Sequence, residues 1–155
     1  MTDTFSKQSR TLVVGVKGRL CAVPLTHVLE IMRPLSLEPI SGVPSFVQGI
    51  SIIRGLPTPV VDLGVLLGMA NSVADRFVTL RVGDRQVALS VDSVLGVREL
   101  DVSKMGELPP LLQGASKNTI AAMGTLDEQL LVVLSAGWEL PDAVWQTLTA
   151  QEVTS

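Results

Sequence analysis

The residues that could do catalytic chemistry in this sequence are few and lie far apart. His27 is the single histidine and Cys21 the single cysteine. A two-histidine metal site is therefore impossible, and a catalytic triad has one candidate base. His27 follows Thr26, a candidate helix cap, where a solvated or structural histidine is the common case. Cys21 lies between Leu20 and Ala22, which is typical of a buried, unreactive thiol.

The carboxylates are spread singly along the chain. Glu99 and Asp101 are next-but-one neighbours at a predicted strand end, so they share one face. A solvated edge is the more common meaning of that spacing than a metal site or an acid–base pair. The sequence has no Walker-type phosphate loop and no G-x-G-x-x-G motif. We expect no enzyme activity, metal, cofactor or small-molecule substrate; a small enzyme or ligand-binding barrel that uses His27 is the alternative.

Arg54 is the most informative charged residue. It ends the nearly uncharged run Phe46–Ile53 and precedes Gly55, which would let the chain turn sharply. An arginine in this position often serves only to keep its charged head in water. A guanidinium held beside apolar surface can also donate a fork of hydrogen bonds to a partner, and arginine is enriched among residues that anchor interfaces.

The composition excludes several classes of protein. The 155 residues are 46% hydrophobic and 17% charged, with a mean hydropathy of +0.43 and a net charge of −3. This is not a disordered chain, and one cysteine excludes a disulfide scaffold. The absence of a basic run argues against nucleic acid as a partner. No apolar stretch reaches the roughly 18 residues that span a bilayer, and the polar N-terminus does not resemble a signal peptide. We expect a cytoplasmic protein with apolar surface patches.

Pairs of short apolar runs, each separated by turn residues, predict four β-hairpins. They are Leu12–Val16 with Leu20–Val23, Phe46–Ile53 with Pro59–Val61, Phe77–Val82 with Arg85–Val91, and Thr119–Leu126 with Gln129–Leu134. Three helices are also predicted from caps and stops. They are a short one capped by Thr26, carrying Val28, Ile31 and Met32 and ended by Pro34; one capped by Asp62 over Leu63–Leu67 and followed by Gly68; and one from Pro141 to about Gln151 with Val144, Trp145 and Leu148 inward.

The chain also resembles itself when it is shifted so that Leu12 meets Val78. The first hairpin then falls on the third without gaps, and Val28–Ile31 falls on Val94–Val97. Farther on, Gly55 and Val60–Val61 correspond loosely to Gly124 and Val132–Val133. Two hairpins can agree by chance, but the matched turn and the segment after it favour a duplication. The pattern predicts two β lobes of about five strands, each curled into a small barrel and joined by one hydrophobic seam.

Three segments, in order, resemble motifs of the CheW family, the adaptor proteins of bacterial chemotaxis. Ala22–Ile31 and Val87–Val97 resemble two of them. The third lies between these two and matches at Phe46, Val47, Gly49, Arg54, Gly55, Pro59, Val60, Val61, Asp62 and Leu63. The resemblance covers about residues 10–136, which we expect to form the CheW-like domain. Residues 1–9 are expected to be a flexible tail and residues 137–155 a C-terminal helix and tail.

The resemblance implies a mainly β fold: two intertwined, five-stranded SH3-like barrel subdomains around a shared hydrophobic core, with short helices and a C-terminal helix. It also implies a non-catalytic adaptor. Its partners would be the cytoplasmic tip of a methyl-accepting chemoreceptor and the regulatory domain of a CheA-type histidine kinase, itself CheW-like. The protein would reach the membrane through receptors only.

The resemblance also assigns residues to these partners. The receptor-binding positions are Val28, Glu30, Ile31, Gly49, Ile53, Arg54 and Gly55. The kinase-binding positions are Val91, Val94, Gly96 and Val97. A receptor helix could lay its apolar stripe in a groove between the lobes, with Glu30 and Arg54 flanking it as opposite charges.

The sequence departs from the family pattern at two places. Ile52-Ile53 precedes Arg54, where the family often has a polar residue and Leu, and Leu134-Ser135 replaces the usual Leu-Asp. The pathway therefore stays open. A module of a pilus or surface-sensing system, one that competes with a true coupling protein, and a generic β module of another assembly are alternatives.

Overall fold

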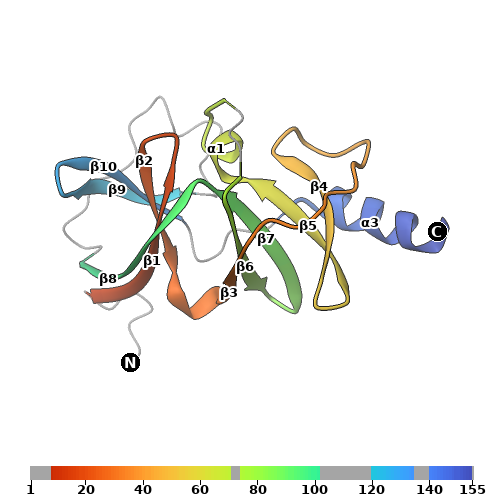
Figure 1. Cartoon of the computed structure of the whole chain (residues 1–155), viewed down its shortest axis with the longest axis horizontal. Helices are drawn as coiled ribbons and strands as arrows, with labels where there is room; N and C mark the ends of the chain where they lie inside the picture. Colours follow the sequence, from red (N-terminus) through yellow and green to blue (C-terminus); the bar gives the residue numbers. More distant parts are fainter. Residues whose placement is uncertain (1–7, 71–73, 102–119, 135–139, 155) are drawn as a thin grey trace.

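The computed structural model describes residues 8–70, 74–101, 120–134 and 140–154 of the chain (Figure 1). Residues 1–7 of the predicted tail, Thr119 and Ser135 therefore lie outside the described residues. The strands are β1 Gln8–Val16, β2 Arg19–Pro24, β3 Val28–Met32, β4 Val47–Ile53, β5 Leu56–Asp62, β6 Arg76–Val82, β7 Arg85–Val91, β8 Ser93–Asp101, β9 Ile120–Leu126 and β10 Gln129–Leu134. The helices are η1 Leu25–His27, α1 Leu63–Leu66 and α3 Asp142–Thr154.

The strands form two curled sheets of five, which lie side by side in Figure 1. The first barrel has the order β8-β1-β2-β10-β9 and the second barrel the order β3-β6-β7-β5-β4. All four predicted hairpins are present, each as an antiparallel pair. This architecture confirms the predicted fold class.

The two sheet orders have the same form. Exchanging β1 with β6, β2 with β7, and so on to β5 with β10, converts one order into the other. Each barrel therefore takes a hairpin from one repeat and three strands from the other, which is a duplication whose halves are exchanged. This arrangement explains why the chain begins in the first barrel, builds the second and then returns.

The parallel strand pairs correct the register of the repeat. Val60 on β5 lies opposite Ala88, and Val133 on β10 lies opposite Ala22. Because Ala22 and Ala88 are equivalent positions of the repeat, the counterpart of Val60 is Val133 rather than Val132. The turn at Arg54–Gly55 then corresponds to the turn at Asp127–Glu128, and the expected match of Gly55 with Gly124 is wrong.

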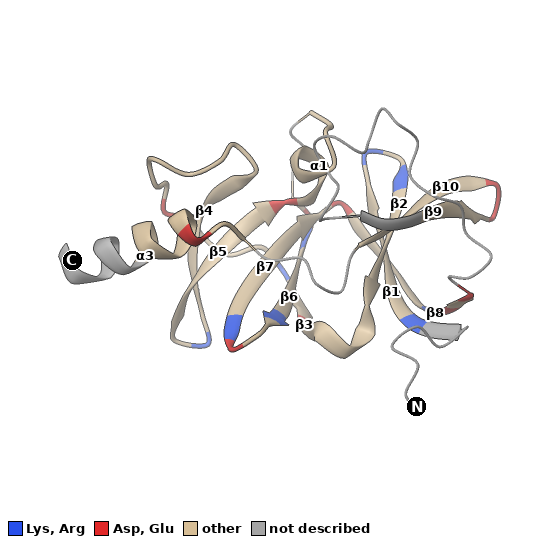
Figure 2. Cartoon of the chain, turned by 180° about the vertical axis from the view of Figure 1, so that it is seen from behind, with Lys and Arg blue, Asp and Glu red and all other residues tan. Residues whose placement is uncertain are grey.

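The predicted hydrophobic seam is present as one buried cluster that both sheets share. Leu12, Val14 and Val16 of β1 belong to it, together with Leu89 and Val91 of β7. Alternate residues of the same strands point into the separate barrel interiors. Those interiors contain Val13, Leu20, Ala22, Leu100, Leu131 and Val133 in the first barrel, and Ile53, Val60, Phe77 and Ala88 in the second. The charged residues that Figure 2 colours lie mostly at turns and strand ends.

The helix predicted after Thr26 is wrong, because Val28–Met32 forms strand β3. Only a single 3-10 turn, Leu25–His27, precedes it. The β6 edge offers backbone hydrogen-bonding groups that β3 satisfies, with Val28 opposite Leu80 and Ile31 opposite Val78. The alternating exposure along β3 is that of a half-buried strand. Tertiary pairing therefore outweighed the local capping signal.

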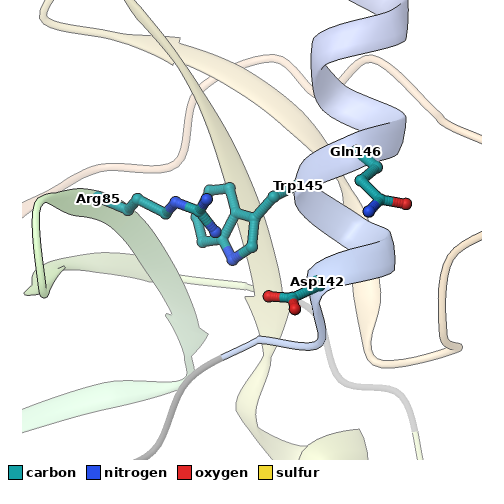
Figure 3. Close-up of a pocket in the computed structure, with 4 residues that line it drawn as sticks. All are labelled: Arg85, Asp142, Trp145 and Gln146. Carbon is teal, nitrogen blue, oxygen red and sulfur yellow. The ribbon is translucent and has the colours of Figure 1, made fainter.

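The two other predicted helices are confirmed. The Asp62 Oδ1 atom accepts a hydrogen bond from the Val65 amide at 3.2 Å and caps α1, while Gly68 has a φ of 86° after it. The C-terminal helix α3 buries Val144 and Leu148 in the shared cluster. The Arg85 guanidinium carbon lies 4.6 Å from the centroid of the Trp145 ring, which fastens α3 to β7 (Figure 3).

Candidate functional site

The potential catalytic residues are in structural positions. The His27 Nδ1 atom lies 3.2 Å from the Arg81 carbonyl oxygen. Cys21 is 1% exposed, and burial raises the pKa of its thiol to about 12 despite a hydrogen bond with the Leu134 backbone. Glu99 lies 3.9 Å from Arg10 in an exposed pair. Among the described residues, no cluster of His, Cys, Asp and Glu could hold a metal ion.

Arg54 and Glu30 form the best-defined polar contact on the surface. The Arg54 Nε and Nη2 atoms donate to the two Glu30 carboxylate oxygens at 2.8 Å each. The Arg54 side chain is 72% exposed and that of Glu30 is 29% exposed. The hydrogen bond with Arg54 lowers the pKa of Glu30, and Glu30 in turn raises the pKa of Arg54. This planar, bidentate geometry fixes the direction of the guanidinium.

The backbone explains why these two side chains meet. Arg54 and Gly55 have φ angles of 55° and 77° in the tight turn between β4 and β5, which is the conformation of a short hairpin loop. Glu30 is held on β3, where its amide donates to Thr79 Oγ1 at 3.1 Å. Strands β3 and β4 are at opposite ends of the sheet order, so the ion pair joins the two edges of the second barrel. The two charges therefore bind each other in this structure, and the expectation that they flank the apolar stripe of a receptor helix stays a prediction.

In the sequence, large apolar residues stand on both sides of Glu30 and of Arg54. Leu29 and Ile31, on either side of Glu30, are each 44% exposed. Ile52 and Leu56, which flank Arg54 at equal spacing, are 60% and 53% exposed. We call the six residues Leu29, Glu30, Ile31, Ile52, Arg54 and Leu56 the Arg54 surface. Exposed apolar residues next in the sequence to a fixed arginine and its partner are typical of a protein-binding surface.

Three residues predicted for receptor binding are buried or half-buried and do not belong to the Arg54 surface. Ile53 is 1% exposed inside the second barrel, and Gly49 is buried on β4. Val28 is half-buried and packs against the shared cluster. Ile53 and Gly49 cannot touch a partner in this structure, so we withdraw them as direct contacts.

The residues predicted for kinase binding lie at the end of β7 and along β8. Val91 is fully buried, so its side chain is also withdrawn as a contact. Val94 is half-buried against the shared cluster, and Gly96 has a φ of 126°. Val97 is 52% exposed, and its neighbour Leu95 is 50% exposed. We call Leu95, Gly96 and Val97 the β8 surface.

The β8 surface is the counterpart of β3 in the repeat. In the alignment of the chain with itself, Leu29 and Ile31 correspond to Leu95 and Val97, and all four side chains are exposed. The turns carry opposite charges: the β4–β5 turn is blue and the β9–β10 turn is red in Figure 2. In the first barrel, Arg98 Nη2 lies 3.7 Å from Asp127 Oδ2. Arginine is thus on the turn in one barrel and on the strand in the other.

Sequence reasoning missed four of these exposed residues, Leu29, Ile52, Leu56 and Leu95. The alternation along Val28–Ile31 and Val94–Val97 was a usable signal, because it places Leu29 and Leu95 on the face opposite to the half-buried residues. Two surface hollows were not foreseen either. One, of about 440 Å³, is lined by Arg85, Asp142, Trp145 and Gln146 (Figure 3); the other, of about 270 Å³, includes Arg19, Asp92 and Leu95. The groove between the lobes stays a prediction.

Within the part of the chain that the structure describes, no helix has the length and apolar character needed to cross a membrane.

Comparisons with known proteins agree with this architecture. The family model of the CheW-like domain matches residues 10–137. A comparison with curated protein sequences finds no match. Among solved structures, the scaffolding protein TtCheW from Thermoanaerobacter tengcongensis is similar, with a TM-score of 0.69 and 22% identity over 82% of this chain and 88% of that chain. At this identity the structural likeness shows the fold alone. The family match, which spans most of the sequence, shows that the chain belongs to the CheW-like domain family, the non-catalytic scaffold and coupling proteins of chemotaxis-type signalling.

Proposed function

We propose that this chain couples the cytoplasmic tip of a chemoreceptor to the regulatory domain of a CheA-type histidine kinase. It would act in the cytoplasm and reach the membrane only through its receptors. The observation that carries the proposal is the fixed, exposed guanidinium of Arg54 in its bidentate pair with Glu30, two residues whose neighbours in the sequence are exposed apolar side chains. The family match supports the scaffold role, and the surface chemistry supports the choice of partners.

The receptor tip is assigned to the Arg54 surface. A guanidinium has five N–H donors, and Glu30 takes two of those of Arg54. The remaining donors belong to a side chain that is 72% exposed, where carbonyl or carboxylate oxygens of a helix end can reach them. Leu29, Ile31, Ile52 and Leu56 supply apolar area for the stripe of an amphipathic helix.

The kinase regulatory domain is assigned to the β8 surface. Leu95 and Val97 present exposed apolar side chains on a strand at the edge of the first sheet. A second β domain can pack against such an edge or pair with it. Two separate surfaces would allow receptor and kinase to be held at the same time, which coupling requires.

The receptor contact is tested with Arg54→Ala. The purified protein is titrated with a helical-hairpin fragment of the receptor tip, and binding is measured by calorimetry. We expect micromolar affinity for the wild type and a loss of roughly tenfold in the variant, as for an interface anchor. Arg98→Ala is the matched control, because it removes the arginine of the ion pair in the first barrel and should leave receptor affinity within about twofold.

The kinase contact is tested with Val97→Asp. This change places a charge in the β8 surface, so affinity for the isolated kinase regulatory domain should fall roughly tenfold while receptor affinity is kept. If the wild type binds neither partner, the proposed function is wrong. Binding to only one partner would instead indicate a module that competes with a true coupling protein.

A further inference from the structure

Gly49 lies on β4 next to residues 33–46, which connect β3 to β4 and which we call the strap. Two backbone hydrogen bonds join the strap to β4: the Glu38 amide donates to the Ile50 carbonyl at 2.8 Å, and the Ile50 amide donates to the Glu38 carbonyl at 2.9 Å. The buried Ser51 hydroxyl donates to the Ser36 carbonyl at 2.7 Å. These contacts hold the first half of the strap along the outer edge of β4.

The space beside Gly49 is filled by the strap itself. A Cβ atom at this position would be 2.5 Å from the Glu38 carbonyl oxygen and 3.1 Å from the carbonyl carbon. Both are backbone atoms, so no side-chain rotation relieves the clash. Any larger residue at this position must push the strap away from β4. The Glu38–Ile50 bridge would open first, because it involves the same carbonyl group.

The two halves of the strap have different surroundings. Ile40, Val43 and Phe46 pack against the shared cluster and anchor the second half. Leu35 and Leu37 in the first half are 43% and 38% exposed. The first half begins directly after β3, the strand that carries Glu30. It then lies along β4, the strand that ends next to Arg54. The Glu38–Ile50 bridge is antiparallel and Ser36 contacts Ser51, so the first half of the strap runs beside the part of β4 that leads to the Arg54 turn.

We infer that Gly49 positions the strap so that Leu35 and Leu37 extend the Arg54 surface toward the apolar stripe of the receptor helix. Gly49 is a positioning residue, because it is buried and makes no contact with the partner. The inference rests on the proposed function for the identity of the partner. The strap geometry itself stands on the Glu38 and Ser51 contacts alone.

The first test uses Gly49→Ala, with Gly64→Ala as the matched control. Gly64 is also buried, but a Cβ there would meet the Val16 side chain at 2.9 Å and Asp62 Oδ1 at 3.2 Å, and the atoms it meets do not belong to Glu38. Hydrogen exchange of the Glu38 amide reports whether the strap leaves β4. We expect exchange at Glu38 to accelerate at least about tenfold in Gly49→Ala and to match the wild type in Gly64→Ala once global stability is accounted for.

The second test measures affinity for the receptor-tip fragment. Gly49→Ala should weaken binding roughly tenfold, and Ser51→Ala, which loosens the strap without adding bulk, roughly threefold. The double variant Leu35→Ser/Leu37→Ser keeps the strap bonds and should also lose about tenfold while its melting temperature stays unchanged. Affinity for the kinase regulatory domain should stay within about twofold in all three, which an effect of general destabilisation would not produce.

The outcomes separate the inference from the proposed function. Unchanged exchange at Glu38 in Gly49→Ala overturns the inference whatever the partner is. Faster exchange with wild-type receptor affinity, or wild-type affinity in the double leucine variant, also overturns it while the proposed function survives. If the wild type does not bind the receptor tip, the proposed function and the assignment of the leucines to a receptor helix both fail.

Discussion

The two barrels share one strand order but carry opposite charges at equivalent turns. In the second barrel the turn holds Arg54 and the strand holds Glu30, whereas in the first barrel the turn holds Asp127 and the strand holds Arg98. On the strands the exposed apolar residues Leu29 and Ile31 keep apolar counterparts in Leu95 and Val97, whereas Ile52 and Leu56 beside the turn correspond to Thr125 and Gln129. The buried apolar pattern therefore preserved the fold in both halves, while the few charged turn residues diverged and could give each barrel its own partner.

The two ion pairs also differ in geometry. The Glu30–Arg54 pair has two hydrogen bonds of 2.8 Å, while Arg98 and Asp127 are 3.7 Å apart. A bidentate pair holds its guanidinium in one direction, but a long pair between exposed side chains is weak and easily screened by salt. Of these two pairs, the one in the second barrel therefore presents the preorganised cation to a partner.

The largest effect is expected where the barrels meet. Val91 is fully buried in the cluster that both sheets share, so Val91→Asp places an unpaired charge among aliphatic side chains. The free energy of unfolding should fall by about 4 kcal/mol or more, and both barrels should unfold in one transition. Chemical denaturation followed by circular dichroism measures this.

Val97→Asp is the control for that experiment. Val97 is on the next strand and is 52% exposed, so the same charge should change stability by less than about 1 kcal/mol. Two separate transitions in Val91→Asp would show that the barrels are independent units, and the shared cluster would then not join them.

The second prediction exchanges the charges of the Arg54 surface. The double variant Glu30→Arg/Arg54→Glu keeps an ion pair between β3 and the turn. It gives the β4–β5 turn a negative charge, as on the equivalent turn of the first barrel. Because opposite charges still meet, the melting temperature should stay near that of the wild type. Receptor affinity should fall about tenfold or more, since the partner now faces a carboxylate.

The single variants complete this test. Arg54→Glu alone leaves two carboxylates side by side and should lose both affinity and some stability. Recovery of full receptor affinity in the double variant would mean that the pair matters only for joining the edges of the barrel. The sign of the charge on the turn would then not contribute to receptor recognition.

Most of the fold followed from the sequence because its signals are local. Alternating apolar residues and turn residues predicted all four hairpins, and the self-match of the chain predicted the duplication. Strand β3 was predicted as a helix, because Thr26 and Pro34 bracket a segment whose pairing partner, β6, is distant in the sequence. The matched segment Val94–Val97, which lies in strand β8, was the evidence that could have corrected it.

The candidate site was less predictable. Arg54 and Glu30 were singled out, but their mutual hydrogen bonds depend on how the edges of the second barrel meet, and no local pattern encodes that. Ile53 and Val91 were assigned to partners because they belong to the motifs, but both are buried, and motif membership does not distinguish a residue that contacts a partner from one that supports the surface.

The third prediction concerns the equivalent turns. Asp127 and Glu128 have φ angles of 51° and 66°, close to those of Arg54 and Gly55. A glutamate at this φ is strained, whereas glycine adopts it freely. Glu128→Gly should therefore stabilise the protein by about 0.5–1 kcal/mol. Thermal unfolding measures the change, and Gly55→Ala should shift stability in the opposite direction by a similar amount.

The smallest effect is the pH dependence of the Glu30–Arg54 pair. The hydrogen bond with Arg54 lowers the pKa of Glu30 below its ordinary value of 4.5. The folded state therefore favours the ionised form of Glu30 more than the unfolded state does. The pair consequently contributes stability above pH 4.5. That contribution is lost as the pH falls through the folded-state pKa. The melting temperatures of wild type and Glu30→Gln should differ near neutral pH and converge in acid, below the folded-state pKa of Glu30.

In the Glu30→Gln background, Arg54→Ala should change the melting temperature equally at neutral and at acidic pH, because no carboxylate remains at position 30. A gap that persists in acid would mean that Glu30 stabilises β3 through packing, and the contrast between the two barrels would then lie in shape rather than in charge.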